Sequence, residues 1–516
     1  MPHIANPTAY LCCARVCQPA RCHLFFRYYA SMADSETLWR GRWWLPEAPE
    51  DEQYGTLICS ETGALRLELV GGFDDTIKTP LEGGQGASIS PGDGFPMILG
   101  QCGNEYFTLL DCSTISLGGM LFLNLSNHIL NVSRALRGVA LDYPDEPVFS
   151  GIELEIDYLL FWSCLTTMSA ELKLDEQQRW SGWQDAHTAP VDALTAEWRN
   201  LSITVDLAYS AFKYKTDNAN ARSLSASEKA QVMIRASRPT SYSGFDRHAK
   251  CFQDLLTFSL NYPCAQRSVE LVLSEHVAAR SAATRNVQVL GKRVYSTDQS
   301  PHNDLGVGHK FFFRLNQVAT FGELIPAWYD LYDRCFLACN MLFGLKYLSQ
   351  GFISTRVLTV ASALESMHRS LGDHKSMPDD EFDALMQQVM AGVEGAERRQ
   401  WVKSRLHNQL SYGQRAREIA RTPNAEAVQL LLTDSAKWSL ILRECRNGLA
   451  HASEQNGLSN GELLFRLLRV TSTLLSLTLM EHLGISAVVE LEAVEANQEV
   501  AYDRREFARL MVEHFT

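Results

Sequence analysis

The chain has 516 residues, 46% hydrophobic and 21% charged, and its 47 basic and 60 acidic residues give a formal charge of −13. This length exceeds what one hydrophobic core usually holds, and the composition excludes a disordered chain. The acidic balance argues against unspecific coating of nucleic acid, although it leaves room for a local basic patch.

The first 31 residues differ from the rest in being rich in Cys, Arg and aromatic residues without periodicity. We interpret residues 1–31 as a non-native or disordered leader and expect translation to start at Met32. The 13 cysteines have no framework spacing, which favours reduced thiols in a cytoplasmic protein. Zinc binding is the alternative for a cluster that lacks a CxxC pair, formed by Cys12, Cys13, Cys17, Cys22 and His23.

Strand-like patterns dominate from Trp39 to about residue 235. Leu65–Leu69 and Ile152–Ile156 alternate apolar and polar residues, as half-buried strands do. The Gly- and Pro-rich stretch from Gly71 to Gly100 is predicted to be loop. We therefore predict a β-rich region over residues 32–300, in one piece or as two subdomains that divide near 235–250, with residues 32 to about 235 forming a sandwich or an open barrel.

Helical periodicity replaces the strand pattern after Phe321. We predict a helical bundle over residues 301–490 and a tail helix over 491–516. The most apolar run, Leu463 to Leu483, contains Arg466 and Glu481, which favours a core helix over a membrane span. The fold class is multidomain α+β, a β-rich N-terminal region followed by an all-α bundle. The predicted helices of the bundle are Leu324–Tyr347, Ile353–Leu371, Asp379–Val393, Arg398–Leu410, Gly413–Arg421, Ala425–Arg446 and Glu462–Leu483.

Arg446 and His451 form a pair that can act on a phosphodiester. A guanidinium binds phosphate oxygens in pairs, and an imidazole exchanges a proton near neutral pH. Together they suffice for metal-free RNA cleavage, in which the ribose 2′-OH attacks the adjacent phosphate. On an ideal helix five residues turn by about 500°, which leaves the two side chains roughly 140° apart. They converge only if the helix ends or distorts near Gly448, or if a second copy of the chain faces the first.

The Arg-x4-His spacing alone is weak evidence, because it also occurs at Arg369 with His374 and at Arg509 with His514. We interpret both of these pairs as solvated helix faces. The Arg446–His451 pair differs in its context, since Asn447 directly follows its arginine and apolar helices flank the run on both sides.

That context resembles a known family. The run from Leu440 through Arg446-Asn447-x3-His451 is similar to the Arg-Asn-x3-His signature of HEPN domains, and the helix around Glu365 resembles their acidic first-helix motif. The resemblance covers nearly all of residues 39–484. The segments that resemble the N-terminal domain of the ApeA family, in this order, are Trp43–Pro46, Gly55–Leu57, Gly63–Leu69, Leu99–Gly100, Thr108–Cys112 and Phe149–Trp162.

The resemblance implies a bacterial anti-phage protein of the abortive-infection type, a toxin whose HEPN domain is an endoribonuclease cleaving host or phage RNA, tRNA among them. It implies that Arg446 binds the scissile phosphate and that His451 is the general acid and base. Asn447 would orient this pair or bind phosphate, and Glu365 would position Arg446. Because HEPN nucleases act as dimers, a homodimer or higher homo-oligomer through this domain is implied. A phage-derived trigger is expected as a partner, whereas a metal, a cofactor and a membrane are not.

The densest basic stretch offers candidate RNA contacts at Arg398, Arg399, Lys403 and Arg405, and Arg443 adds one a turn before the motif. A solvated helical face is an equal alternative for this stretch. Two rival functions stay open. In one, the HEPN bundle is catalytically inert and serves dimerisation or partner binding, with the β-rich half as the ligand-binding or sensing module. In the other, the β-rich half binds carbohydrate or a phage protein and the bundle is a scaffold.

Overall fold

The structure, a computed structural model, forms two compact units, Met1–Glu146 with Glu275–Asp298 and Pro147–Ser274 with Gln299–Thr516. The predicted leader and its cysteine cluster lie outside the described residues. The structure describes residues 36–74, 76–80, 87–92, 94–118, 127–177, 179–188, 191–217, 221–278, 285–291, 311–348, 351–372, 375–451 and 460–515.

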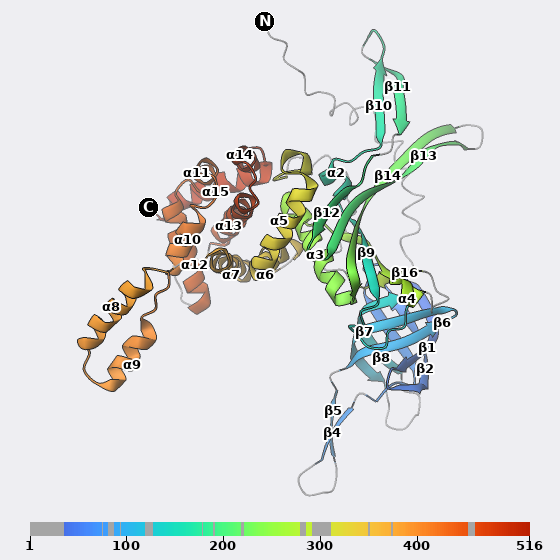
Figure 1. Cartoon of the computed structure of the whole chain (residues 1–516), viewed down its shortest axis with the longest axis horizontal. Coiled ribbons are helices and arrows are strands. Elements are labelled where there is room, and N and C mark those ends of the chain that lie inside the picture. The colour runs from blue at the N-terminus through green and yellow to red at the C-terminus, as the bar shows by residue number, and fades with distance from the viewer. Residues whose placement is uncertain are drawn as a thin grey trace. The chain divides into compact units, whose positions relative to one another are not determined.

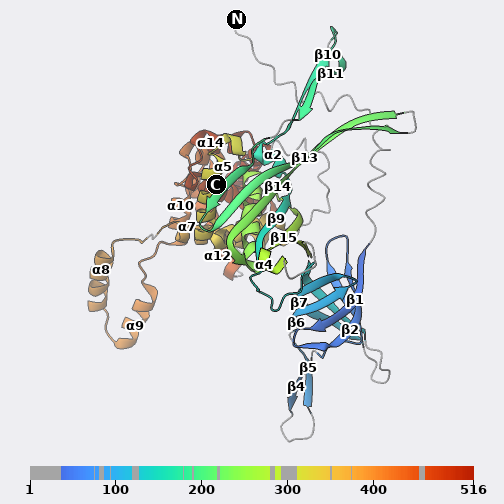
Figure 2. The same ribbon diagram turned by 45° about the vertical axis from the view of Figure 1, so that its right-hand side comes forward.

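The first unit contains a closed barrel of antiparallel strands (Figures 1 and 2). The strand order is β8-β3-β2-β1-β6-β7, and β7 pairs again with β8 to close the ring. Beside the barrel lie the hairpin of β4 (Thr76–Pro80) and β5 (Ala87–Pro91), the short helix α4 (Glu275–Ala278), and β16 (Asn286–Leu290), which pairs with β8. The barrel strands are β1 (Thr37–Leu45), β2 (Ala48–Cys59), β3 (Leu65–Val70), β6 (Phe95–Cys102), β7 (Glu105–Gly118) and β8 (Asn127–Arg137).

Alternation along the strands builds the barrel core. Leu65, Leu67 and Leu69 of β3 are buried, as the alternating pattern predicts. The ring of Trp43 packs in the same core, and a Cβ on Gly100 would lie 2.1 Å from it, so this position of β6 requires glycine.

Two predictions for this region are wrong. The barrel is closed rather than open, because Leu109 of β7 pairs with Ile98 on one side and with Ala135 on the other. The stretch from Gly71 to Gly100 is not all loop, since it contains most of β6, whose consecutive Ile98 and Leu99 are buried.

The second unit begins with a sheet in the order β12-β13-β14-β9-β15. The long β13–β14 hairpin projects beyond the rest of this sheet (Figure 1), and helix α3 packs against β9 and β14. The elements of this part are β9 (Phe149–Ile156), α2 (Leu159–Ser163), β10 (Met168–Leu174), β11 (Trp180–Thr188), β12 (Leu194–Trp198), β13 (Leu201–Asp217), β14 (Ala221–Thr240), α3 (Tyr242–Ser259) and β15 (Gln266–Leu273).

Helices make up nearly all of the described residues from Phe321 to the C-terminus, as predicted. The helix predicted over Ile353–Leu371 is confirmed as α7. Two predicted helices are each divided in the structure, one at Cys335 and one at Thr433, whose φ of 61° is left-handed. The helices are α5 (Phe321–Arg334), α6 (Phe336–Tyr347), α7 (Ile353–Leu371), α8 (Asp379–Ala391), α9 (Ala396–Arg405), α10 (Tyr412–Ile419), α11 (Ala425–Leu432), α12 (Ser435–His451), α13 (Gly461–His482), α14 (Ala487–Glu495) and α15 (Gln498–Phe515).

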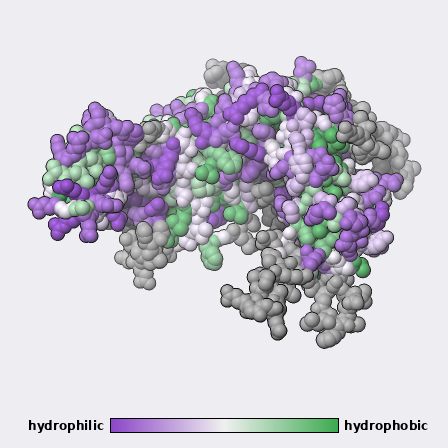
Figure 3. Space-filling model, turned by 60° about the horizontal axis from the view of Figure 1, so that its bottom comes forward, coloured by the Kyte–Doolittle hydropathy of each residue, from purple (hydrophilic) through white to green (hydrophobic). Residues whose placement is uncertain are grey.

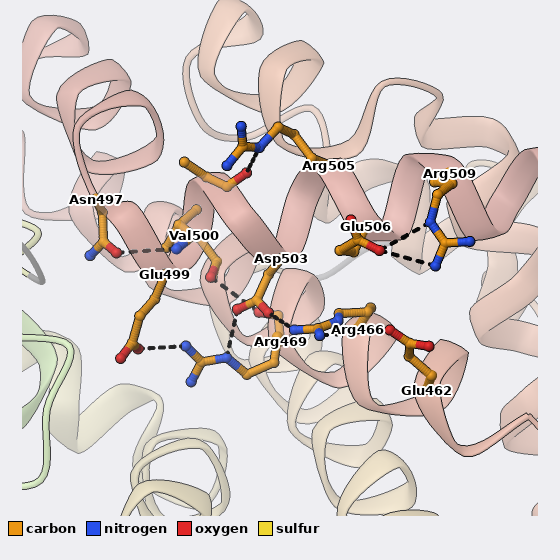
Figure 4. A network of polar contacts seen from close by, with 12 residues as sticks. Glu462, Arg466, Arg469, Asn497, Glu499, Val500, Asp503, Arg505, Glu506 and Arg509 are labelled. Carbon is orange, nitrogen blue, oxygen red and sulfur yellow. Dashed lines mark hydrogen bonds and ion pairs between the residues drawn. The ribbon is translucent and has the colours of Figure 1, made fainter.

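Helix α13 is the central helix of the bundle. Its length and composition would allow it to cross a membrane, but 78% of its most apolar window is buried in the protein, as in a core helix. It contacts α7 on one side and α15 on another. Helix α15 is fixed by buried ion pairs: the carboxylate of Asp503 accepts hydrogen bonds from Arg466 Nη1 at 2.5 Å and Arg469 Nε at 2.8 Å (Figure 4).

Helices α8 and α9 form a hairpin of a different character (Figures 1 and 2). Neither helix has a buried residue. In Figure 3 this end of the molecule shows hydrophilic residues around a smaller hydrophobic patch, and Trp401 on α9 is 63% exposed. The hairpin therefore contributes little to the hydrophobic core of the bundle.

Candidate functional site

Helices α7 and α12 pack side by side and bring Glu365 close to Arg446. Each helix buries an apolar stripe, with Leu364 on α7 and Cys445 on α12 among the buried residues. Glu365 directly follows the buried Leu364, and Arg446 directly follows the buried Cys445. Both lie at the edge of the seam where the two helices pack. Glu365 Oε2 is 3.9 Å from Arg446 Nη2, with side chains 26% and 38% exposed. The structure thus brings together two residues that are 81 positions apart in the chain (446 − 365).

Tyr412 supports Arg446 from a third helix. It opens α10, whose start is capped by Ser411, and its hydroxyl donates to the carbonyl oxygen of Ala361 on α7 at 3.2 Å. The Arg446 guanidinium carbon lies 5.6 Å from the centre of the Tyr412 ring, within cation–π range. Burial raises the pKa of Tyr412, and the Glu365 carboxylate raises it further, while Arg446 lowers it.

Tyr412 is not among the residues that the sequence predicts for the site. The helix predicted here begins one residue later, and no spacing links Tyr412 to the Arg446 run. Only the packing of α10 against α7 and α12 reveals the contact.

Asn447 and His451 complete the predicted motif on α12. Arg446 Nη1 donates to Asn447 Oδ1 at 3.2 Å, and Asn447 is exposed. The helix continues through the buried Gly448 and ends at His451, so the break that would let the two side chains of one chain converge is not present in this described helix. The predicted break near Gly448 is therefore not found, and a regular helix keeps positions 446 and 451 roughly 140° apart. Convergence within one chain is thus excluded for this helix, which leaves the second copy of the chain. The side chain of His451 lies outside the described part of the structure.

The candidate RNA contacts divide between two places. Arg443 lies on α12 one turn before Arg446, is 46% exposed, and is 3.9 Å from Glu444. The others belong to the α8–α9 hairpin, where Arg399 Nε donates to the Val393 carbonyl oxygen at 2.8 Å. These α9 residues are Arg398, Arg399, Lys403 and Arg405, all of them exposed.

Two family models match the chain. ApeA N-terminal domain 1 matches residues 38–328, more than half of the sequence. The chain belongs to the ApeA family. The model Apea-like HEPN matches residues 358–488, so the C-terminal helices form the HEPN domain of this ApeA-family chain. Glu365, Tyr412 and the Arg446-Asn447-x3-His451 run all lie within the HEPN match, and the predicted family is confirmed.

Other comparisons add little. No curated protein matches the chain. Among solved structures, one titled pT26-6p aligns over 97% of this chain and 96% of its own, at 7% identity and a TM-score of 0.10, which is too low to show a shared fold.

In this ApeA-family HEPN domain, the arrangement can bind an anion at an oriented cation. Arg446 has one neighbouring carboxylate, an aromatic face against it and an amide beside it, and it stays partly exposed. Such a fixed, accessible guanidinium is suited to a phosphate group. Among the residues that the structure describes, no group of three or more His, Cys, Asp or Glu side chains could hold a metal ion.

Proposed function

We propose that the chain is an endoribonuclease that needs no metal and cleaves host or phage RNA, tRNA among them, in abortive-infection anti-phage defence. The observation that carries this proposal is the contact between Glu365 and Arg446 inside the HEPN match. Membership of the ApeA family supports a role in anti-phage defence, and the Arg446 guanidinium can bind a phosphodiester. A cytoplasmic location follows from such substrates.

The reaction balances with protein side chains alone. The ribose 2′-OH attacks the adjacent phosphorus and loses its proton to a base, the P–O5′ bond breaks, and the leaving oxygen takes a proton. A 2′,3′-cyclic phosphate and a 5′-OH end result. In our proposal Arg446 binds the phosphate and stabilises its developing charge, and His451 transfers the protons. Asn447 orients this pair or binds the phosphate, and Glu365 positions Arg446.

We propose further that two copies of the chain form the cleft. Because α12 is continuous from Arg446 to His451, one chain presents these positions in different directions. Two α12 helices facing each other would let each cleft take residues from both chains. The face of α12 that carries Leu440, Arg443 and Asn447 is exposed and so accessible to such a partner.

One observation favours the inert bundle as a second candidate. The shorter ion pair of Glu365 is with Arg369, at 2.7 Å, and a carboxylate held in this way also suits a purely structural role. In that case the domain would serve dimerisation or partner binding, and the β-rich half would be the sensing module.

The test is phage plating together with RNA integrity in cells that express the wild type, Arg446→Ala or His451→Ala at matched abundance. Arg505→Ala is the control, since Arg505 is exposed and lies outside the HEPN match. We expect protection and infection-dependent RNA cleavage in the wild type and the control, and neither in the two motif variants. Motif variants that still protect, with RNA intact, would support the inert bundle instead.

A further inference from the structure

A pocket of about 490 Å³ lies beside the Arg446 site. The end of α7, the start of α8, the segment after α9 and helix α10 enclose it. Its volume is in the range of ligand sites that hold a nucleotide-sized molecule. The basic side chains that line it are His368, Arg369, Lys375, His407 and Arg415.

The wall of this pocket is basic on the inside. None of the described residues that line it is acidic. Three carboxylates contact basic residues of the wall at 2.7 Å each without lining the pocket themselves: Glu365 contacts Arg369, Glu418 contacts His368, and Asp379 contacts Lys375. These contacts orient the basic side chains, while no carboxylate is among the described residues that line the pocket.

Arg415 is the most informative of these residues. It is 5% exposed, and its Nε and Nη2 donate to the Leu410 carbonyl oxygen at 3.0 Å and to Gln409 Oε1 at 3.4 Å. It makes no ion pair with a described residue, although burying an unpaired charge is costly. Burial lowers the pKa of Arg415 and the positive charge of Arg369 lowers it further, while the carboxylates of Glu365 and Glu418 raise it. Two guanidinium groups near each other in one pocket favour an anion between them.

One carboxylate links this pocket to the candidate active site. Glu365 Oε1 accepts a hydrogen bond from Arg369 in the pocket wall, and Oε2 faces Arg446. A nucleic acid strand bound at Arg446 therefore lies next to a second basic site, because both sites contact the same carboxylate.

We propose that this pocket binds a phosphate group of the RNA strand next to the scissile one, as a subsite of the nuclease. The inference rests on the proposed function. Phosphate matches the basic residues, since Arg369 and Arg415 can donate in pairs while Lys375 and His407 donate singly. A phosphate contact of this kind positions the strand without reading its sequence.

The test measures RNA binding rather than cleavage. The probe is a short RNA of mixed sequence, 2′-O-methylated so that the attacking hydroxyl is blocked and the wild-type chain cannot cleave it. The variant is Lys375→Gln with His407→Gln, two exposed residues whose replacement leaves the core intact. Arg505→Gln is the control, a charge removed from an exposed position that does not line the pocket.

We expect the double variant to bind the probe about 3- to 10-fold more weakly, and the slope of log affinity against log salt to fall by about one for each phosphate that the variant no longer neutralises. The control should match the wild type. Circular dichroism of each variant checks that it is folded.

Two results would overturn the subsite. One is an unchanged affinity and salt slope in the double variant. The other is that adenosine monophosphate or inorganic phosphate raises the melting temperature of the wild type but not of the double variant, while RNA binding is equal in both; the pocket would then hold a free nucleotide. A wild-type chain that binds no RNA contradicts the proposed function itself, so the two failures are distinct.

Discussion

Glu365 and Arg446 face each other across the α7–α12 seam, with Glu365 Oε2 3.9 Å from Arg446 Nη2. The other oxygen of the same carboxylate is hydrogen-bonded to Arg369 at 2.7 Å. Glu365 is thereby held in place by one arginine while it attracts the other. In the proposed nuclease, this fixes the direction of Arg446 before RNA binds, which lowers the cost of arranging the site.

Glu365→Gln should lower the rate of RNA cleavage. The amide keeps the shape but loses the charge that orients Arg446, and we expect roughly 10-fold lower kcat with little change in KM. Glu365→Asp should recover part of the rate. The matched control is Glu444→Gln, because Glu444 also lies 3.9 Å from an arginine, on α12 itself. Equal activity of Glu365→Gln and wild type in a single-turnover assay would contradict the positioning role.

The hydrogen bond of Tyr412 should affect stability, whereas its ring against Arg446 should affect activity. Tyr412→Phe removes the hydrogen bond to the Ala361 carbonyl oxygen, and we expect a loss of about 1 kcal/mol in the free energy of unfolding. It keeps the ring against Arg446, so cleavage should change little. Tyr412→Leu removes the aromatic face as well and should lower cleavage further. Urea unfolding and single-turnover cleavage, measured on both variants, check this order; a Phe variant as inactive as the Leu variant would contradict it.

Asp503→Ala should destabilise the helical domain strongly. It leaves Arg466 and Arg469 without their shared buried partner (Figure 4), and we expect a loss of about 3–5 kcal/mol. The control on the same helix is Glu513→Ala, whose pair with Arg509 is exposed and should contribute little to stability. Urea unfolding followed by helical circular dichroism measures both. Similar losses in the two variants would show that the burial of Asp503 does not matter.

Glu490 should make the bundle less stable at higher pH. Its side chain is fully buried, and burial together with the neighbouring Glu481 carboxylate raises its pKa from 4.5 to about 7, against a hydrogen bond from the Asn424 backbone nitrogen that lowers it. Between about pH 4.5 and 7 the folded chain holds a proton that the unfolded chain has lost, so stability falls as pH rises through this window. A shift of this size corresponds to about 3 kcal/mol.

Glu490→Gln should remove that dependence. Its amide oxygen can still accept from Asn424, so the variant should exceed the wild type in stability at pH 8 and match it more closely at pH 4.5. The urea midpoints of both proteins at the two pH values check this. A difference between them that is independent of pH would contradict the raised pKa.

Alternation and helical periodicity of hydrophobic residues correctly predicted those strands and helices that bury one face in a single hydrophobic core. The alternation of Leu65 to Leu69 and the periodicity of Ile353–Leu371 both gave correct elements, the helix with its bounds. The closure of the barrel could not be predicted, because it depends on β7 pairing on both edges with strands distant in sequence. The division of a predicted helix at Thr433 was missed although Asp434 caps the start of α12, its Oδ1 accepting a hydrogen bond from Lys437 N at 2.8 Å, because neither glycine nor proline stands there to end the preceding helix.

The candidate site was predictable where family motifs mark it. Glu365 and Arg446 were named from their motifs, and the structure brings them together. Tyr412 and Arg415 take their place near them only because α10 packs against α7 and α12, a tertiary contact without periodicity of its own. Arg369, read as part of a solvated face, is indeed 59% exposed, but it also orients Glu365.

The α8–α9 hairpin has a consequence for how relatives of this chain vary. A residue inside a bundle is restricted by its neighbours, so its invariance reports packing before it reports function. No side chain of α8 or α9 is fully buried, so packing restricts their exposed positions little. An exposed position on α9 that stays invariant among relatives without a contact inside the chain is therefore best explained by a binding partner.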